Sequence, residues 1–460
     1  MIARQRDRML GTESIGKLLI RLSLPASVAM IVTALYNLVD SIFVGRGVGV
    51  EAIGGLTISF PFQMLVMAFS MMIGTGAASV VSRNLGAGNR ERAYRAAGNA
   101  MVAALAFGLT FSLLGALFLS PLLRLFGATP VLAGYARDYL TVILTGTVFI
   151  SFAMAVNNLV RAEGRAAVAM ATMILGAVMN MLLDPIFIFV LKMGIRGAAL
   201  ATVISQALSF TFLLYFFAGG RSSLKVRLRH LLPEMSVLRE IFVLGFPALV
   251  RQGVGSVLVI LMNNALARYG GDIYIAVFGL VFRILHFVLM PVLGIVQGSQ
   301  PIIGYNYGAN SIPRVKRAVR LSIAVATVLS AGGFLLLMTL SGAVFRLFSG
   351  DPALAEAGVP VLRLMVLILP LVGVQMIGAT YFQAVGKAKP AMFLGLSRQV
   401  IFLLPLVIIL PRLFGLWGVF SAFPVADFLS SIITGLWLLK DVRSLTARKD
   451  EPVPDGLLSS

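Results

Sequence analysis

The stretch from Leu22 to Gly45, LSLPASVAMIVTALYNLVDSIFVG, is apolar over a length that lets an α-helix cross a lipid bilayer. It holds a proline, Pro25, near its start and a carboxylate, Asp40, near its end. A charged side chain within the bilayer costs about 2.5–3.5 kcal/mol on insertion scales, so an acid in such a helix indicates a functional site. Tyr36 and Asn37 lie one turn before Asp40 and share its face, which makes both candidate cavity residues. The structural alternative is a hydrogen bond that only joins helices.

The composition of the whole chain is that of a polytopic membrane protein. Of its 460 residues, 59% are hydrophobic and 12% are charged, whereas a soluble domain has about 25% charged residues. The net charge of +20 does not predict nucleic-acid binding here, because the basic residues flank apolar spans and are suited to topology and to anionic lipid headgroups. The chain has no cysteine, which excludes disulfides and thiolate metal sites. The basic segment Met1 to Lys17 predicts a cytoplasmic tail rather than a signal peptide.

Apolar segments of spanning length recur along the chain and predict an all-α membrane protein with twelve transmembrane helices. The segments fall near residues 18–44, 52–82, 96–120, 137–160, 166–191, 194–218, 237–266, 273–303, 318–341, 358–384, 391–412 and 415–439. When the N-terminus is placed inside, most of the 38 lysines and arginines fall in segments on that side. This bias predicts a multi-pass protein with both termini in the cytoplasm.

The two halves of the chain repeat each other at an offset of about 222 residues. Leu24–Ala26 recurs as Phe246–Ala248, and Asn84–Ala87 recurs as Asn306–Ala309. Six helices in each half give both halves the same orientation, so we expect two parallel six-helix bundles related by a pseudo-two-fold axis. Such pairs of bundles move substrates by rocking around a central site. We assign residues 1–220 to an N-lobe, 221–236 to a cytoplasmic linker and 237–460 to a C-lobe.

The carboxylate chemistry is not repeated and belongs to the first lobe alone. At the repeat offset, Asp40 falls opposite Met262 and Asp184 falls opposite Leu406. Asn180 and Thr202 fall opposite Phe402 and Pro424.

Asn180 and Asp184 share one face of the fifth predicted helix, and Pro185 follows directly. Proline removes a backbone donor and clashes with the carbonyl four residues earlier, which leaves an oxygen free for a cation. At 1.5 Å per residue, Asp40, Asp184 and Thr202 all fall about 6–12 Å from the outer helix ends. Such oxygens suit Na⁺, and two carboxylates in one pocket also suit a proton carrier. The sequence therefore predicts a Na⁺ or H⁺ site at these residues; the structural alternative is a polar network that only holds helices together.

A second charged pair is expected in the C-lobe. Arg283 on the eighth predicted helix and Asp427 on the twelfth lie at similar depth from the outside, so we expect them to pair. The pair can be structural, or it can contact substrate as part of the cavity.

At these residues the chain resembles the MATE (multidrug and toxic compound extrusion) transporters. The resemblance rests on Pro25, Leu35–Asp40, Gly86–Gly88, the run QPIIGYNYGA at Gln300–Ala309 and the doubled six-helix plan. It covers roughly residues 15–445 and looks most like the prokaryotic DinF-like and MepA-like branch. It implies export of cationic, amphipathic compounds in exchange for Na⁺ or H⁺, in the cytoplasmic (inner) membrane of a prokaryote. The cation-site residues of that branch match Asp40, Asn180, Asp184 and Thr202. The NorM-like branch has essential acids in its second lobe, where this chain has only Asp427 within a span.

Three classes of function compete on the sequence alone. The first is a cation-coupled exporter of drugs or toxic compounds. The second is a lipid-linked glycan flippase, for which Arg251, Arg283 and Arg398 could make the cavity basic. The third is an intramembrane enzyme with two aspartates. We expect a transporter and not an enzyme, with no cofactor except a coupling ion, and no phosphate-binding loop for ATP is present. We expect small organic molecules and membrane lipids as partners, no nucleic acid, and a monomer.

Overall fold

The computed structural model describes residues 9–127, 130–348 and 352–447, and the regular elements within these ranges are all helices. Before residue 221 they are α2 (Met9–Thr12), α3 (Ile15–Gly47), α4 (Val50–Gly86), α5 (Arg90–Leu117), α6 (Leu119–Leu125), α7 (Pro130–Ala162), α8 (Ala166–Pro185), η1 (Ile186–Val190) and α9 (Gly194–Ala218). After it they are η2 (Leu228–His230), α10 (Met235–Tyr269), α11 (Asp272–Gly308), α12 (Ile312–Thr339), α13 (Ser341–Phe348), α14 (Pro352–Val366), α15 (Leu369–Ala384), α16 (Ala388–Leu396), η3 (Ser397–Leu403) and α17 (Leu404–Ala447). The predicted all-α class is confirmed.

The predicted twelve spans all fall on described helices, and two of them, 391–412 and 415–439, share the helix α17. Nine described segments are long and apolar enough to cross a membrane, and α14 and α15 form a tenth span with a bend of 48° between them. One of the nine, Ala388–Leu445, has 58 residues, enough for two passes, and Gly415 divides it with a left-handed φ of 57°. The 35 residues of α10 are long enough to cross a membrane and correspond to the predicted span at 237–266. The chain is therefore a multi-pass membrane protein.

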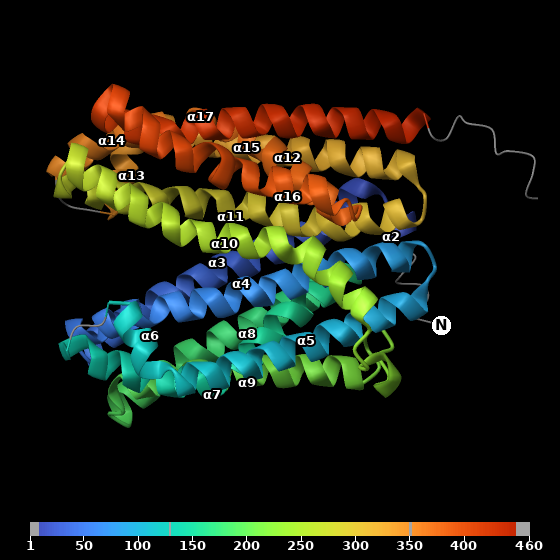
Figure 1. The fold of residues 1–460 in the computed structure, drawn as a ribbon, viewed down its shortest axis with the longest axis horizontal. Helices are drawn as coiled ribbons and strands as arrows, with labels where there is room; N and C mark the ends of the chain where they lie inside the picture. The colour runs from blue at the N-terminus through green and yellow to red at the C-terminus, as the bar shows by residue number, and fades with distance from the viewer. Residues whose placement is uncertain (1–8, 128–129, 349–351, 448–460) are drawn as a thin grey trace, which may run out of the picture.

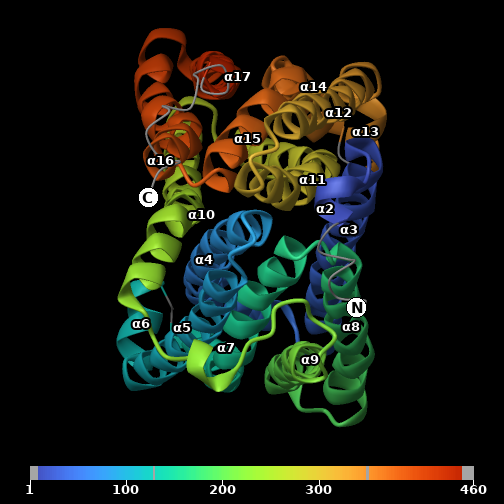
Figure 2. The ribbon, with the colours of Figure 1, turned by 90° about the vertical axis from the view of Figure 1, so that its right-hand side faces the viewer.

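The helices before and after the linker form two groups that lie side by side (Figure 1). Seen from the end of the bundle, α3 and α10 run along opposite flanks between the groups (Figure 2). Each packs against a long helix of the other half, α3 against α11 and α10 against α4. Since α3 and α10 are repeat equivalents, as are α4 and α11, the two contacts are related by the pseudo-two-fold symmetry that the repeat predicts.

Two equivalent glycines let the halves approach closely near α2 and the end of α17. Gly76 of α4 lies against the backbone of Ile241 in α10, and Gly298 of α11 lies against the backbone of Ser23 in α3. A Cβ atom at either glycine would overlap the opposing backbone. Close backbone approach through small residues is a general way to pack helices in membranes. The two halves are thus in intimate contact at this end of the molecule.

Charged side chains join the halves at the same end. Glu240 of α10 accepts a bond from Arg83 of α4 at Oε1 and from Arg92 of α5 at Oε2, each at 2.8 Å. Arg314, the repeat equivalent of Arg92, donates to the carbonyl oxygens of Leu10 at 3.2 Å and Glu13 at 2.6 Å. Each half therefore uses an arginine to hold a segment at the start of the other half.

Candidate functional site

The four residues predicted to bind a cation lie on three neighbouring helices, with Asp40 on α3, Asn180 and Asp184 on α8, and Thr202 on α9. The Asn180 Nδ2 amide donates to Asp184 Oδ1 and to Thr202 Oγ1, both at 3.3 Å. The carboxyl groups of Asp40 and Asp184 are close enough to interact electrostatically. The structure thus brings the four predicted residues into one cluster within the first half of the chain.

Several oxygens of this cluster are buried without a hydrogen-bond partner. Asp184 is 0% exposed and Asn180 is 2% exposed. Within the described residues, Asp40 Oδ1, Asp184 Oδ2 and Asn180 Oδ1 each lack a hydrogen-bond partner. An unpaired polar atom away from water is costly, so native proteins rarely retain one unless it serves a ligand or a reaction. Two carboxylate oxygens, an amide oxygen and a nearby hydroxyl are ligands of the kind that hard cations prefer.

Local sequence explains how α8 presents these groups. Asn180 and Asp184 are four residues apart, so both side chains face α3 and α9, against which α8 packs. The regular α-helix ends at Pro185, as proline at this position predicts, and continues as the π-helix η1. Short π-helical segments are frequent at functional sites. The proline therefore places an irregular backbone directly beside the Asp184 carboxylate.

Two further polar residues near the cluster were not predicted. Tyr139 of α7 is 4% exposed and lies near Asp40 and Asp184, and its hydroxyl accepts a long contact of 3.5 Å from Gln63 Nε2 of α4. Tyr36, a predicted cavity residue, also lies near both carboxyl groups. A glutamine within the apolar span 52–82 is a signal that could have identified Gln63, since an amide in a membrane helix needs a partner. The side chain of Asn37 lies outside the described residues.

The prediction that Arg283 pairs with Asp427 is wrong. Arg398 on η3 donates to both carboxylate oxygens of Asp427, from Nε to Oδ1 and from Nη2 to Oδ2 at 3.2 Å. Arg283 is exposed. Counting residues from a helix end gives depth but not the direction of a side chain. The π-helical turn at Ser397–Leu403 also shifts the direction of Arg398 relative to a regular helix.

The second half has no acidic cluster at the positions that correspond to the first. Met262, opposite Asp40, is fully buried in an apolar cluster of the C-terminal half, and Phe402 and Leu406 pack against that cluster. The positions equivalent to Asp40, Asn180 and Asp184 are thus hydrophobic core. The asymmetry read from the sequence is reproduced in three dimensions.

Two related helical bundles that cross a membrane, with a buried acidic cluster in one of them, define the architecture of a secondary transporter. The MatE family model matches residues 25–186 and again residues 247–409, so the chain belongs to the MatE family. The two matches begin 222 residues apart, as the internal repeat does.

Known relatives support the same family. The Multidrug export protein MepA of Staphylococcus haemolyticus is 27% identical over 414 residues, which cover 90% of this chain and 91% of that protein. The MATE multidrug transporter DinF-BH, solved in complex with R6G, is 46% identical with a TM-score of 0.87 and covers 95% of this chain and 97% of its own. The outward-facing structure of a multidrug resistance MATE family transporter is 27% identical with a TM-score of 0.90, over 95% and 98% of the two chains. The relatives are transporters and not enzymes, and the predicted DinF-like and MepA-like resemblance is confirmed.

Proposed function

We propose that this protein is a secondary antiporter that exports cationic or amphipathic organic compounds in exchange for Na⁺ or H⁺. The observation that best supports coupling is the group of buried, unpaired oxygens on Asp40, Asn180 and Asp184. The substrate class is supported by the relatives, one named a multidrug export protein and another solved with R6G. A coupling ion is then a second substrate, and no further cofactor is needed.

The cluster can work as a binding site that a cation enters from one side of the membrane. When a cation occupies Asp40 and Asp184, it weakens the binding of a cationic compound, and linkage requires that the compound weakens cation binding by the same factor. One charge crossing 100 mV supplies about 2.3 kcal/mol, enough for roughly 50-fold accumulation per charge. The protein needs no ATP for such transport.

The orientation of the molecule completes the proposal. We propose that both termini lie in the cytoplasm, which the distribution of basic residues supports, and that the membrane is the cytoplasmic membrane of a prokaryote. The halves are joined at the end near α2, through Gly76, Gly298 and Glu240. In this orientation the joined end is the cytoplasmic end, which corresponds to an outward-facing state, and a relative of similar fold was solved in that state. We propose that a monomer in contact with membrane lipids is sufficient for transport.

The two alternative functions gain no support. A glycan flippase was considered because three arginines could make the cavity basic, but Arg398 is neutralised by Asp427. An intramembrane enzyme was considered because two aspartates share one depth, but the family consists of transporters.

Purified protein in sealed vesicles tests the proposed function. R6G is supplied on one side, and a Na⁺ gradient or a H⁺ gradient is imposed separately, with protein-free vesicles and vesicles without a gradient as controls. We expect R6G to accumulate against its own gradient under at least one ion gradient. Accumulation that is the same with and without each gradient would refute antiport.

A further inference from the structure

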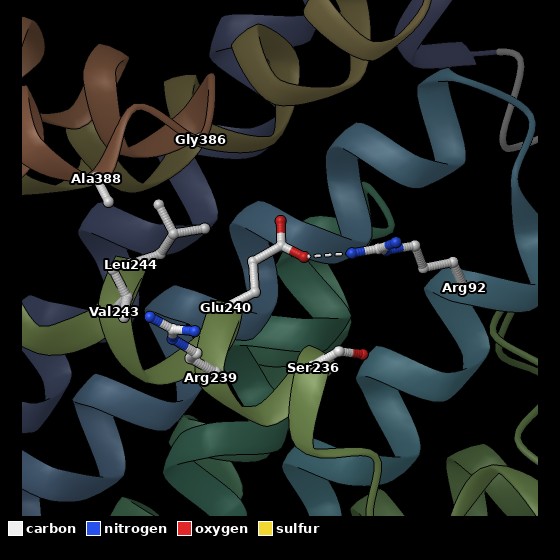
Figure 3. Close-up of a pocket in the computed structure, with 8 residues that line it drawn as sticks. All are labelled: Arg92, Ser236, Arg239, Glu240, Val243, Leu244, Gly386 and Ala388. Carbon is white, nitrogen blue, oxygen red and sulfur yellow. Dashed lines mark hydrogen bonds and ion pairs between the residues drawn. The ribbon is translucent and has the colours of Figure 1, made fainter.

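A pocket of about 390 Å³ opens at the end where the two halves are joined (Figure 3). Its walls come from the start of α5, the first three turns of α10, and the turn between α15 and α16 with the first residue of α16. The lining residues are Arg92, Ser236, Arg239, Glu240, Val243, Leu244, Gly386 and Ala388. The pocket therefore combines elements of both halves at their joined end. None of its lining residues belongs to the Asp40–Asp184 cluster.

The pocket has an excess of positive charge. Its one carboxylate, Glu240, already has both oxygens bound, one by Arg83 and one by Arg92. Arg239 is exposed and forms no ion pair with any residue that the structure describes. In Figure 3, Arg92 and Arg239 lie on opposite sides of Glu240. Two arginines and one carboxylate line the pocket, and the carboxylate is also paired with Arg83 from outside it. This leaves Arg239 available for a bound anion, and arginine matches the geometry of a phosphate group.

The face of α10 beside Arg239 is apolar and exposed. Val243 and Phe246 follow Arg239 by four and seven residues, so the three side chains share one helix face. Val243 is 48% exposed and Phe246 is 42% exposed, and both point away from the core. A basic residue at the helix start followed by an exposed apolar stripe matches the two parts of a phospholipid, a charged headgroup and an acyl chain.

We propose that this pocket binds the headgroup of an anionic phospholipid from the cytoplasmic leaflet, with Arg239 and Arg92 at the phosphate and an acyl chain along Val243 and Phe246. A headgroup in this position contacts α5 of one half and α10 of the other. It therefore favours the arrangement in which the cytoplasmic ends are joined. The lipid acts as a regulator of the transporter and is not transported. The proposal rests on the cytoplasmic orientation given above but not on the identity of the exported compound or of the coupling ion.

The test uses the melting temperature of the purified full-length protein in detergent. Dioleoylphosphatidylglycerol, dioleoylphosphatidylcholine or inorganic phosphate is titrated into wild-type protein and into the variants Arg239→Gln and Arg320→Gln. Arg320 is a matched control, because it is also an exposed arginine, on α12 and outside the pocket. Phosphatidylglycerol is expected to raise the melting temperature of wild-type protein. In Arg239→Gln its half-saturating concentration should rise about fivefold, which corresponds to about 1 kcal/mol for one basic residue. Arg320→Gln should behave as wild type.

Each other outcome contradicts the proposal in a distinct way. An equal rise in the half-saturating concentration of phosphatidylglycerol in Arg239→Gln and Arg320→Gln would mean that the net charge of the protein, and not the pocket, determines lipid binding. An equal effect of phosphatidylcholine would mean that the protein does not distinguish the headgroup charge. If inorganic phosphate alone has the full effect, the ligand is a free anion and not a lipid. The melting temperature reports lipid binding without any transport step. The result therefore tests the pocket even if the protein does not transport R6G.

Discussion

Substitution of Thr202 tests whether the proposed cation site binds Na⁺ or H⁺. The Thr202 hydroxyl lies 3.3 Å from the Asn180 amide nitrogen and donates to the Ala198 carbonyl at 3.0 Å, so an oxygen lone pair remains next to the cluster. A hydroxyl oxygen can bind Na⁺, whereas a proton needs only a carboxylate.

Thr202→Val is therefore expected to weaken Na⁺-driven transport by about tenfold, equivalent to about 1.4 kcal/mol of ion binding. H⁺-driven transport should change little. The measurement is R6G uptake into vesicles under each gradient, and Thr202→Ser, which keeps the hydroxyl, is the matched control. Equal losses under both gradients would make Thr202 a packing residue or the site a proton site alone.

The Arg398–Asp427 pair gives a second prediction at the residue scale. Asp427 is almost fully buried, so removal of one partner leaves an unpaired charge, which costs about 3–5 kcal/mol. Arg398→Met alone and Asp427→Leu alone should each unfold at lower temperature, and the double variant should recover most of the loss. Arg283→Met is the control and should stay within about 0.5 kcal/mol of wild type, because Arg283 is exposed. Additive losses in the double variant would show that the two side chains are not coupled.

The sequence predicted which polar residues lie together in the candidate site, but it did not predict the partner of Asp427. Asp40, Asn180, Asp184 and Thr202 could be selected because polar groups are expensive inside a membrane and must serve a purpose. The partner of Asp427 could not be selected, because pairing depends on the rotation of a helix about its axis. That rotation is set by packing and by the π-helical segment at Arg398, neither of which an apolar pattern reveals.

At the scale of elements, the start of the linker between the halves is bonded to the first half by a buried acid, and Asn99 of α5 bonds the linker further along, at His230, Leu232 and Glu234. Glu163 lies in the turn between α7 and α8, and its Oε2 accepts bonds of 2.8 Å from Ser222 Oγ, Ser223 Oγ and the Ser223 backbone amide. Burial raises the pKa of the Glu163 carboxyl group above its usual value. The start of the linker is therefore an ordered segment bonded to the first half.

Glu163→Ala is expected to free the start of the linker, because two hydroxyls and one backbone amide lose their hydrogen-bond acceptor. Each buried donor left without a partner costs about 1–3 kcal/mol. Glu163→Gln keeps an acceptor oxygen and should stay close to wild type. Limited trypsin digestion measures the effect, since Lys225 and Arg227 lie in the released segment and are exposed. Unchanged cleavage of Glu163→Ala would mean that other contacts hold the linker.

The long helices were predictable at this scale, but their irregular parts were only partly so. Pro185 indicated a disturbed backbone beside Asp184, but the predicted span ran on to residue 191, and the change to the π-helix η1 after Pro185 was not predicted. The π-helix at Ser397–Leu403 has no proline within it and could not be predicted from local sequence. The approach of Tyr139 to the cluster depends on how α7 packs between neighbouring helices, which is a tertiary property.

At the scale of the whole molecule, the two halves must separate at their joined end, which we propose is the cytoplasmic end, for the candidate site to open on that side. Glu240 bridges Arg83 and Arg92 there, and Ser79 Oγ of α4 donates to the Gln383 carbonyl of α15 at 2.5 Å. The internal repeat predicted two rocking bundles, but it could not predict which end is joined, because both states share one sequence.

Glu240→Gln is expected to shift the population toward the state that is open at this end. The chain lacks cysteine, so Ser79→Cys supplies a single label site at the buried contact. Maleimide labelling of this cysteine should be about tenfold faster with Glu240→Gln, because hydrogen bonds to charged groups contribute about 1.5–3 kcal/mol. Glu356→Gln, at an exposed position in α14, is the control and should not change the rate. An unchanged rate in Glu240→Gln would show that the ion pairs do not hold the halves together.

The central claim is that the carboxylates of the first half couple ion entry to export. The most direct measurement is R6G transport into vesicles by wild type, Asp40→Asn and Asp184→Asn, under imposed Na⁺ and H⁺ gradients, with R6G binding to each purified protein as the control for folding. Asparagine keeps the size of the side chain but removes its charge. We predict that both variants still bind R6G and that neither accumulates it under either gradient. Gradient-driven accumulation by both variants at the wild-type level would contradict the claim and place the coupling site elsewhere.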